Sequence, residues 1–384
     1  MNTTMVQHVD VFRVACSGPG DLRGVQALID SGALRPADIV AVIGKTEGNG
    51  CVNDYTRDFA AASWCHFLAP HLGCSAAEVD TRIALVMSGG TEGVLSPHFN
   101  VFARRWLPAQ DQARDKRLVV GTARTRDFLP EEIGRLAQLD CTADAVQAAM
   151  RDAGIADTAD VHFVQIKCPL LTSAKVNAAL ACGVSPITHE SYESMGYSRG
   201  ASALGVAVAL GEVVRATVTQ DAVLADWSLY SARASASAGI ELEGNVVIVL
   251  GEAAGAVSPF RIAHTVMQDA VDSNSVRVLL KQVFNLDAEH DSVAVQQQLV
   301  NLLAKAEASP NGMVRGQRHT MLNDSDINAT RHARAAVGAV LASVAASTAL
   351  YVSGGAEHQG PAGGGPVAAI VRVEGLAAQQ GKRL

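Results

Sequence analysis

Two segments of the sequence align without gaps: Ala37-Asp38-Ile39-Val40-Ala41-Val42-Ile43-Gly44-Lys45 and Ala159-Asp160-Val161-His162-Phe163-Val164-Gln165-Ile166-Lys167. Each is a short run, rich in β-branched and other apolar residues, that opens near an aspartate and ends in a lysine. Such a run is typical of a buried β-strand. A weaker third copy, 299–305, also ends in a lysine, although its period does not separate strand from helix. The chain therefore carries an internal repeat.

A serine signature, Ser-(Gly/Ala)-Gly-x-Glu, also occurs three times, at 88–92, 237–241 and 353–357. The first and third copies follow strand-like runs, whereas the second follows the Ala/Ser-rich stretch 231–236. A further strand-like run comes after each copy, at 117–121, 246–250 and 367–373. Glycine near the serine keeps the backbone open, so that amide groups can point into a site.

Between the lysine and the serine of each copy lies a Ser/Thr-Arg pair that we expect to open an Ala-rich helix: Thr56-Arg57, Ser198-Arg199 and Thr330-Arg331. Serine and threonine are favourable N-caps, but an arginine at a helix start opposes the helix dipole. Three such placements indicate that the arginines bind a ligand anion or carbonyl group. In the third copy Arg334 lies one turn later and is the competing choice.

The order lysine, arginine, serine thus recurs three times, with spacings too unequal for a strict solenoid. We expect an α/β fold made of three homologous β-α-β-β-type units, arranged with pseudo-threefold symmetry around a central active site. The predicted units are residues 1–130, 131–260 and 261–384.

The repeated residues suggest nucleophilic chemistry. A serine hydroxyl attacks only when a base accepts its proton, and no histidine occurs at matching positions in the three copies. A lysine that is desolvated and near arginine cations has a lowered pKa and can serve as that base. Backbone N–H groups beside the serine could form an oxyanion hole. A symmetric centre of this kind fits a small, planar ligand with carbonyl groups around a ring.

The composition excludes several classes of protein. The 384 residues are 48% hydrophobic and 18% charged, with a net charge of −7 and no basic run, so we expect no nucleic-acid partner. No apolar stretch is long enough to span a membrane, and the N-terminus lacks the pattern of a secretory signal. Seven cysteines without a CxxC pair indicate free thiols in the cytoplasm.

The Gly-rich stretch 354–366 lacks the GxxxxGK[ST] pattern of a phosphate-binding loop. Its carbonyl groups, together with a carboxylate such as Glu307, could instead hold a hard cation. No HxH or HExxH pattern occurs, which disfavours a metal-dependent hydrolase. We expect no organic cofactor.

Four segments, 44–57, 87–97, 193–200 and 353–366, resemble the cyanuric acid hydrolase/barbiturase family. The resemblance extends from about Val9 to Val373. It implies a three-unit fold, a homotetramer, and hydrolytic opening of cyanuric acid to carboxybiuret, which loses carbon dioxide to give biuret. It also implies a structural Mg²⁺ or Ca²⁺ ion.

The resemblance assigns roles residue by residue. Lys167 and Ser237 would be the catalytic pair. The substrate-binding residues would be Lys45, Arg57, Ser88, Gly89, Arg199, Ala238, Lys305, Arg331, Ser353 and Gly354. The cation ligands would be Glu307, Ala356, Gln359, Gly360, Pro361 and Gly364.

Several alternatives stay open at this point. Ser235 lies two residues before Ser237, on the same face of a strand, and is the reserve nucleophile. Barbiturase, which opens barbituric acid to ureidomalonate, is the nearest alternative activity. A non-catalytic protein that binds cyclic ureides would need the arginines but not the lysine–serine pairs.

Overall fold

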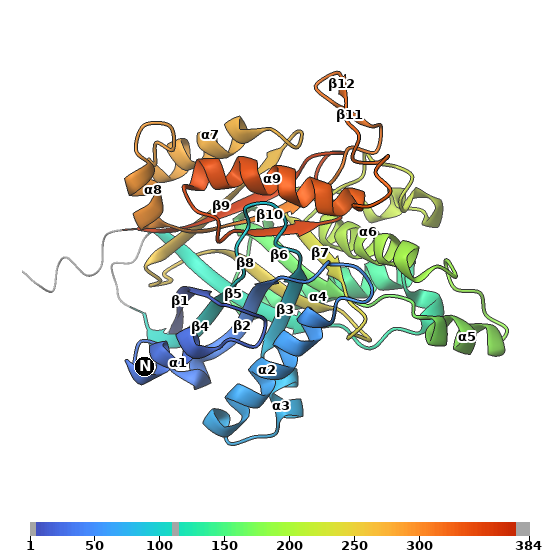
Figure 1. Cartoon of the computed structure of the whole chain (residues 1–384). Helices are drawn as coiled ribbons and strands as arrows, with labels where there is room; N and C mark the ends of the chain where they lie inside the picture. Colours follow the sequence, from blue (N-terminus) through green and yellow to red (C-terminus); the bar gives the residue numbers. More distant parts are fainter. Residues whose placement is uncertain (1–4, 110–114, 374–384) are drawn as a thin grey trace, which may run out of the picture.

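The computed structural model describes residues 5–109 and 115–373, which form three four-stranded sheets with helices packed outside them (Figure 1). The strands of the first sheet are β1 (Met5–Ala15), β2 (Ile39–Thr46), β3 (Ala84–Gly89) and β4 (His98–Pro108). The accompanying helices are α1 (Arg23–Asp30), α2 (Tyr55–Leu72) and α3 (Ala76–Arg82).

The second and third units repeat this plan. The second sheet contains β5 (Lys116–Arg124), β6 (Val161–Cys168), β7 (Ala234–Ala238) and β8 (Val246–Ala254). Its helices are α4 (Leu136–Ala153), α5 (Ser173–Ala181) and α6 (Ser191–Ala209). The third sheet contains β9 (Phe260–Met267), β10 (Leu299–Ala306), β13 (Tyr351–Gly354) and β14 (Gly365–Arg372). Its helices are α7 (Ser273–Phe284), α8 (Ser292–Gln298) and α9 (Ala329–Ala345), and a small hairpin joins β11 (Met313–Val314) to β12 (Gln317–Arg318).

All three sheets have the same connectivity. The first strand of each unit pairs antiparallel with the fourth, the fourth pairs antiparallel with the second, and the second pairs parallel with the third. A parallel pair needs a crossover, and the long helix of each unit (α2, α6 or α9) lies in that crossover. The expected α/β fold of three homologous units is confirmed.

The strand at 117–121 belongs to a different unit from the one we expected. It is part of β5, which pairs with β8 in the second sheet, whereas the closing strand of the first unit is β4. The sequence of β4 carries His98, Asn100, Arg104 and Arg105, and these polar residues hide its strand character. By sheet membership, the second unit therefore begins at β5, before residue 131, and the third begins at β9.

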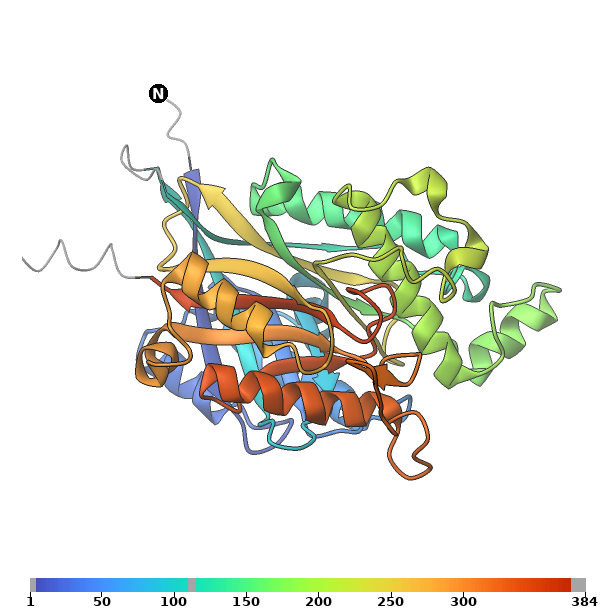
Figure 2. The same ribbon diagram turned by 90° about the horizontal axis from the view of Figure 1, so that it is seen from above.

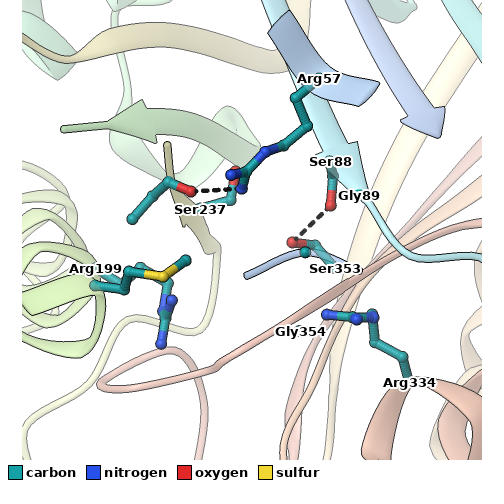
Figure 3. A pocket seen from close by; sticks show the side chains of 11 residues that line it. Arg57, Ser88, Gly89, Arg199, Ser237, Arg334, Ser353 and Gly354 are labelled. Atoms are coloured by element: carbon teal, nitrogen blue, oxygen red, sulfur yellow. Dashed lines mark hydrogen bonds between the residues drawn. The ribbon is translucent and has the colours of Figure 1, made fainter. Parts of the chain in front are cut away.

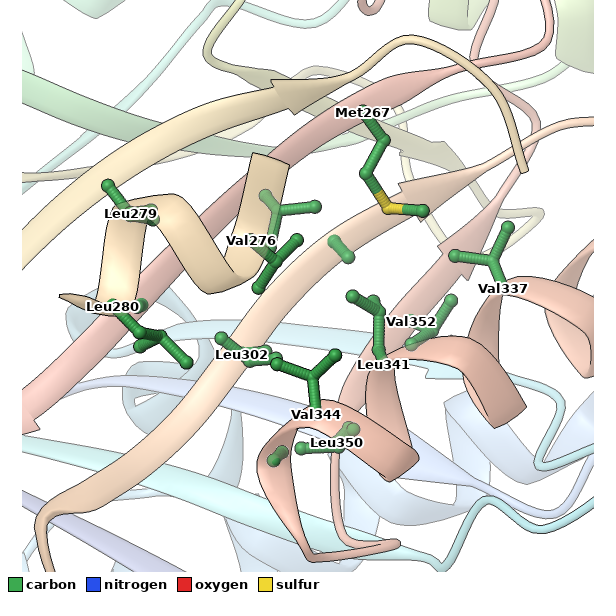
Figure 4. Close-up of a cluster of buried hydrophobic side chains, with 14 of the residues drawn as sticks. Met267, Val276, Leu279, Leu280, Leu302, Val337, Leu341, Val344, Leu350 and Val352 are labelled. Carbon is green, nitrogen blue, oxygen red and sulfur yellow. The ribbon is translucent and has the colours of Figure 1, made fainter. Parts of the chain in front are cut away.

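The three sheets enclose a central core, and each packs its helices on the outer face (Figures 1 and 2). Side chains from all three sheets meet in the central cluster, among them Phe102, Phe163, Phe260 and Tyr351. Strand β10 shows why its period was ambiguous. Leu303 packs into the central core, while Leu302 packs outward among the helices α7 and α9 (Figure 4). A strand that is apolar on both faces loses the usual alternation.

Helix α6 begins at Ser191, so the expectation that Ser198-Arg199 opens a helix is wrong. Its Gly- and Ser-rich sequence forms a buried helix because small residues allow close packing. A Cβ atom on Gly205 would lie 2.6 Å from the backbone oxygen of Leu139 in α4. The other two helices do begin beside their arginines, but the capping side chains are Asp54 and Asn328. None of the helices in the described ranges has the length and hydropathy to cross a membrane.

Candidate active site

The parallel strand pairs place each repeated lysine beside its serine. Lys45 is opposite Ser88 on β2 and β3, Lys167 is opposite Ser237 on β6 and β7, and Lys305 is opposite Ser353 on β10 and β13. Because neighbouring parallel strands end at the same edge of a sheet, each of the three sheets carries its lysine–serine pair at one edge.

The three edges meet around one pocket (Figure 3). Its lining includes a serine and the following residue from each unit, and one arginine from each unit. The lining residues are Gly50, Arg57, Ser88, Gly89, Met195, Arg199, Ser237, Ala238, Arg334, Ser353 and Gly354. The hydroxyl groups of Ser88 and Ser353 lie 3.3 Å apart, although 265 positions separate them in the sequence. The structure therefore brings the predicted serines together at one centre.

The lysines lie just beneath this pocket and are almost completely buried. Burial removes water from the ammonium group and so lowers its pKa. The pKa of Lys167 is lowered to about 8 and that of Lys305 to about 7, chiefly by burial. Burial also holds the pKa of Lys45 well below its usual value. An amine with such a pKa is partly neutral near pH 8 and can accept a proton.

Ser237 differs from the other two serines. Lys45 Nζ lies 3.4 Å from Ser88 Oγ, and Lys305 Nζ lies 3.3 Å from Ser353 Oγ. Ser237 Oγ is buried but has no hydrogen-bond partner within the described chain. Lys167 Nζ instead donates to the carbonyl oxygen of Met87, at 2.8 Å. The hydroxyl of Ser237 is thus available to a ligand.

Ser235 lies away from the pocket. Its hydroxyl donates to Gln165 Oε1 at 2.8 Å, and it is not part of the pocket lining. The register of the two strands explains this, because Ser235 is opposite Gln165 while Ser237 is opposite Lys167. The geometry therefore favours Ser237 over Ser235 as the nucleophile.

The third arginine that lines this pocket is Arg334, whereas Arg331 lines an adjoining pocket. The Arg331 side chain is 38% exposed, whereas that of Arg334 is 3% exposed and lines the pocket. Both contact Glu92, but only Arg334 makes a two-pronged bond to it, at 2.7 and 2.5 Å. The alignment of Thr-Arg pairs pointed to Arg331 with Arg334 as its competitor, and Arg334 lies one helical turn further along α9.

The signature glutamates were missed by the sequence reasoning. Glu92 binds Arg334, and Glu357 binds Arg199 through two bonds of 2.7 and 2.6 Å. Each carboxylate holds the fork of a guanidinium at the pocket. The signal was present, because the glutamate recurs in all three copies of the serine signature.

Glu307 and the loop after β13 have the chemistry of a hard-cation site. Oε2 of Glu307 is buried with no hydrogen-bond partner among the described residues, and burial beside Glu357 raises the pKa of Glu307 to about 8. A bound cation would keep this carboxylate ionised. The loop adds carbonyl oxygens, including those of Ala356 and Pro361, which each accept one turn hydrogen bond and keep a second lone pair. The side-chain oxygen of Gln359 accepts from the Ala236 N–H at 2.7 Å and keeps one lone pair, and the backbone oxygen of Gln359 is a second candidate ligand. Gly360 and Gly364 are tightly packed, against Gly365 and Met267 respectively, and could contribute backbone oxygens.

This three-unit fold, with lysine–serine pairs and three arginines at one pocket, is that of a hydrolase that acts on cyclic amides. Residues 10–372 match the family of amidohydrolase ring-opening proteins, and the chain belongs to this family.

Among its relatives, a cyanuric acid amidohydrolase of Pseudomonas sp. (strain ADP) is 60% identical over 368 residues, covering 95% of this chain and 99% of that one. A cyanuric acid amidohydrolase of Bradyrhizobium diazoefficiens is 59% identical over 374 residues, covering 97% and 100%. A solved cyanuric acid hydrolase structure, described as an evolutionary innovation by structural concatenation, matches with a TM-score of 0.92 and 59% identity, over 96% of this chain and all of that one. The enzyme from A. caulinodans matches with a TM-score of 0.87 and 49% identity, over the same shares.

Proposed function

We propose that this protein opens the ring of cyanuric acid by hydrolysis and yields carboxybiuret, which decarboxylates to biuret. The observation that carries the proposal is the convergence of three serines and three arginines on one pocket, with a buried lysine opposite each serine on the neighbouring strand. Cyanuric acid is planar and presents three equivalent carbonyl groups. A ligand with threefold symmetry can use like side chains from all three units at once.

In the proposed mechanism, neutral Lys167 accepts the proton of Ser237 as Ser237 Oγ attacks a ring carbonyl carbon. The arginines stabilise the charge that develops on the carbonyl oxygen. The ring C–N bond then breaks, Lys167 returns the proton to the leaving nitrogen, and an acyl group remains on Ser237. Water, deprotonated by Lys167, cleaves that ester and restores the serine. The pairs Lys45–Ser88 and Lys305–Ser353 hold and polarise the other carbonyl groups.

A steady-state assay with cyanuric acid and barbituric acid on one preparation tests this function. We expect turnover of cyanuric acid with much slower turnover of barbituric acid. Preferred turnover of barbituric acid would make the protein a barbiturase. Tight binding of both without product would make it a binding protein.

Arg334 is expected to grip the substrate, whereas Arg331 is not. Replacing Arg334 with lysine keeps the charge but loses the planar fork, so KM should rise about 10-fold or more. The matched variant Arg331→Lys should change KM by less than about 2-fold, since an exposed ion pair contributes little. Measurement of kcat and KM for both variants checks this. Equal effects would return Arg331 to the site.

We also propose that Mg²⁺ or Ca²⁺ binds at Glu307 and the loop of Ala356, Gln359, Gly360, Pro361 and Gly364. Its support is the orphaned carboxylate oxygen of Glu307. The ion would supply a fixed positive charge that holds this loop. Treatment with a chelator should lower the melting temperature by a few degrees, and Mg²⁺ or Ca²⁺ should restore it. A Glu307→Gln variant should melt lower and no longer respond to the chelator. An unchanged melting curve for the wild type after verified metal removal would refute the site.

We further infer that the enzyme is a cytoplasmic homotetramer. All seven cysteines are free, which suits a reducing compartment. The tetramer rests on the family resemblance and is tested by light scattering after gel filtration, where a mass four times that of the chain is expected.

A further inference from the structure

The glutamate of the serine signature breaks the symmetry of the site. In two units it receives a guanidinium from the neighbouring unit: Arg334 donates to Glu92, and Arg199 donates to Glu357. The same pattern would pair Glu241 of the second unit with Arg57 of the first.

That pair does not form. Arg57 donates instead to the carbonyl oxygens of Ala238, at 2.9 Å, and Cys51, at 2.8 Å. The carboxylate of Glu241 lies 3.3 Å from Lys167 Nζ, and its other oxygen has no hydrogen-bond partner in the described chain. Lys167 is thus the lysine whose ammonium faces the signature carboxylate directly.

The lysine and the arginine have exchanged partners relative to the other two units. Lys45 and Lys305 each donate to the carbonyl oxygen of the residue after the serine, Gly89 at 3.1 Å and Gly354 at 3.0 Å. In the second unit Arg57 occupies the equivalent carbonyl oxygen, that of Ala238. Because Arg57 binds that carbonyl oxygen, Lys167 contacts Glu241 instead.

The backbone of the loop differs accordingly. Gly90 and Gly355 have left-handed φ angles of 98° and 76°, and a Cβ atom on either would lie 2.6 Å from a guanidinium nitrogen. Gly239 has no positive φ angle, and a Cβ atom there would lie 2.3 Å from the Glu241 carboxylate. The carboxylate therefore sits over Gly239, where guanidinium groups sit in the other two units.

A cavity of about 200 Å³ reaches Lys167 and Glu241 from behind. Asp58, Ala62 and Asp80, which are exposed, line it, so it opens to the surface. Neither Ser237 nor any other residue that lines the active-site pocket lines this cavity. Lys167 is thus opposite Ser237 of the active-site pocket and also contacts a water-accessible space, whereas Lys45 and Lys305 do not line this cavity.

We propose that Glu241 is the positioning residue of Lys167, and that this rear cavity is the route by which Lys167 exchanges protons with water. The proposal rests on the ring-opening function proposed above. When Lys167 is protonated, its ammonium passes the proton to the Glu241 carboxylate, and Glu241 passes it to water in the cavity. Neutral Lys167 then accepts the proton of Ser237. The partner exchange explains how one of three similar pairs is selected to react.

The electrostatics agree with this role. Burial lowers the pKa of Lys167, while the Glu241 charge opposes that effect and raises it. The same Lys167 charge helps to lower the pKa of Glu241, against its burial. The Glu241 charge therefore makes Lys167 a stronger base than burial alone would leave it. A stronger base removes the serine proton more effectively.

The variant Glu241→Gln tests the positioning role through the pH profile. Loss of the carboxylate charge lowers the pKa of Lys167, so the acid limb of kcat/KM should move to lower pH. We expect kcat to fall about 10-fold or more, with little change in KM. The matched variants Glu92→Gln and Glu357→Gln release an arginine, so they should raise KM and leave the limb in place. The substrate's own titration is common to all variants and cancels. An unmoved limb in Glu241→Gln, or equal shifts in the matched variants, would overturn the proposal.

A second measurement does not depend on turnover. Competitive acetylation with acetic anhydride across a pH series, followed by peptide mass spectrometry, reports when each lysine becomes nucleophilic. Lys167 should react with a midpoint near pH 8, and that midpoint should move down in Glu241→Gln. An Ala62→Leu variant, which fills the rear cavity, should slow labelling of Lys167 but not of Lys45 or Lys305. Unchanged labelling of Lys167 in both variants would refute the proposal, even if the wild type opened neither ring.

Discussion

Replacing Ser237 with alanine is expected to lower turnover of cyanuric acid on the order of 10⁴-fold or more, since the proposed acyl intermediate forms on its hydroxyl. Ser237 Oγ is buried at the pocket with no hydrogen-bond partner in residues 5–109 and 115–373, while the hydroxyls of Ser88 and Ser353 contact each other. The fold should be unaffected, because a serine hydroxyl without a hydrogen bond contributes little to stability. Steady-state rates and a thermal melt of the variant measure the two effects.

The symmetry of the chain supplies matched controls for this prediction. Ser88→Ala and Ser353→Ala make the same chemical change at equivalent positions, and they should still form an acyl-enzyme on Ser237. Rapid quenching followed by peptide mass spectrometry would find that adduct. An adduct on Ser88, Ser353 or Ser235 would move the nucleophile to that residue.

Replacing Lys167 with methionine is expected to lower kcat by about 10²- to 10⁴-fold, the usual contribution of a general base. Methionine keeps much of the length of the lysine side chain and stays buried, so packing at the edge of β6 should be preserved. Lys45→Met and Lys305→Met are the matched variants, and they should weaken substrate binding more than the chemical step. A Lys167→Met enzyme with normal kcat would exclude Lys167 as the base.

The pH dependence of the wild-type enzyme also tests whether Lys167 is the base. Burial lowers the pKa of Lys167 to about 8, so the amine is protonated below that pH and neutral above it. A base must be neutral to accept a proton, so kcat/KM should rise as the pH increases through about 8 and then level off. The Lys167→Met variant should lack this rise. Its persistence would assign the limb to another group, with Lys305 the first candidate.

Much of this architecture could be predicted from residue order. The repeat of runs ending in lysine predicted three units, because the runs ending in Lys45 and Lys167 are clear apolar strands and a weaker third run ends in Lys305. The recurrence of serine after each lysine predicted the pairs, since parallel strands end at a common edge. Strand β4 escaped prediction because its polar residues interrupt the pattern, and the ambiguous run 299–305 became a strand only through packing on both faces.

The repeated order of lysine and serine, read along the chain, was enough to expect a shared centre and to favour Ser237 while leaving Ser235 open. Only the strand register, which places Ser235 opposite Gln165 and Ser237 opposite Lys167, separated the two serines. The choice of Arg334 over Arg331 required the tertiary structure, because two arginines one turn apart on α9 differ only in which one is buried. The partner exchange between Arg57 and Lys167 was likewise invisible in the repeat, where Glu241 matches Glu92 and Glu357. Local sequence repeats encode similar elements, but the distances between charges on different units arise only when the three sheets close around one centre.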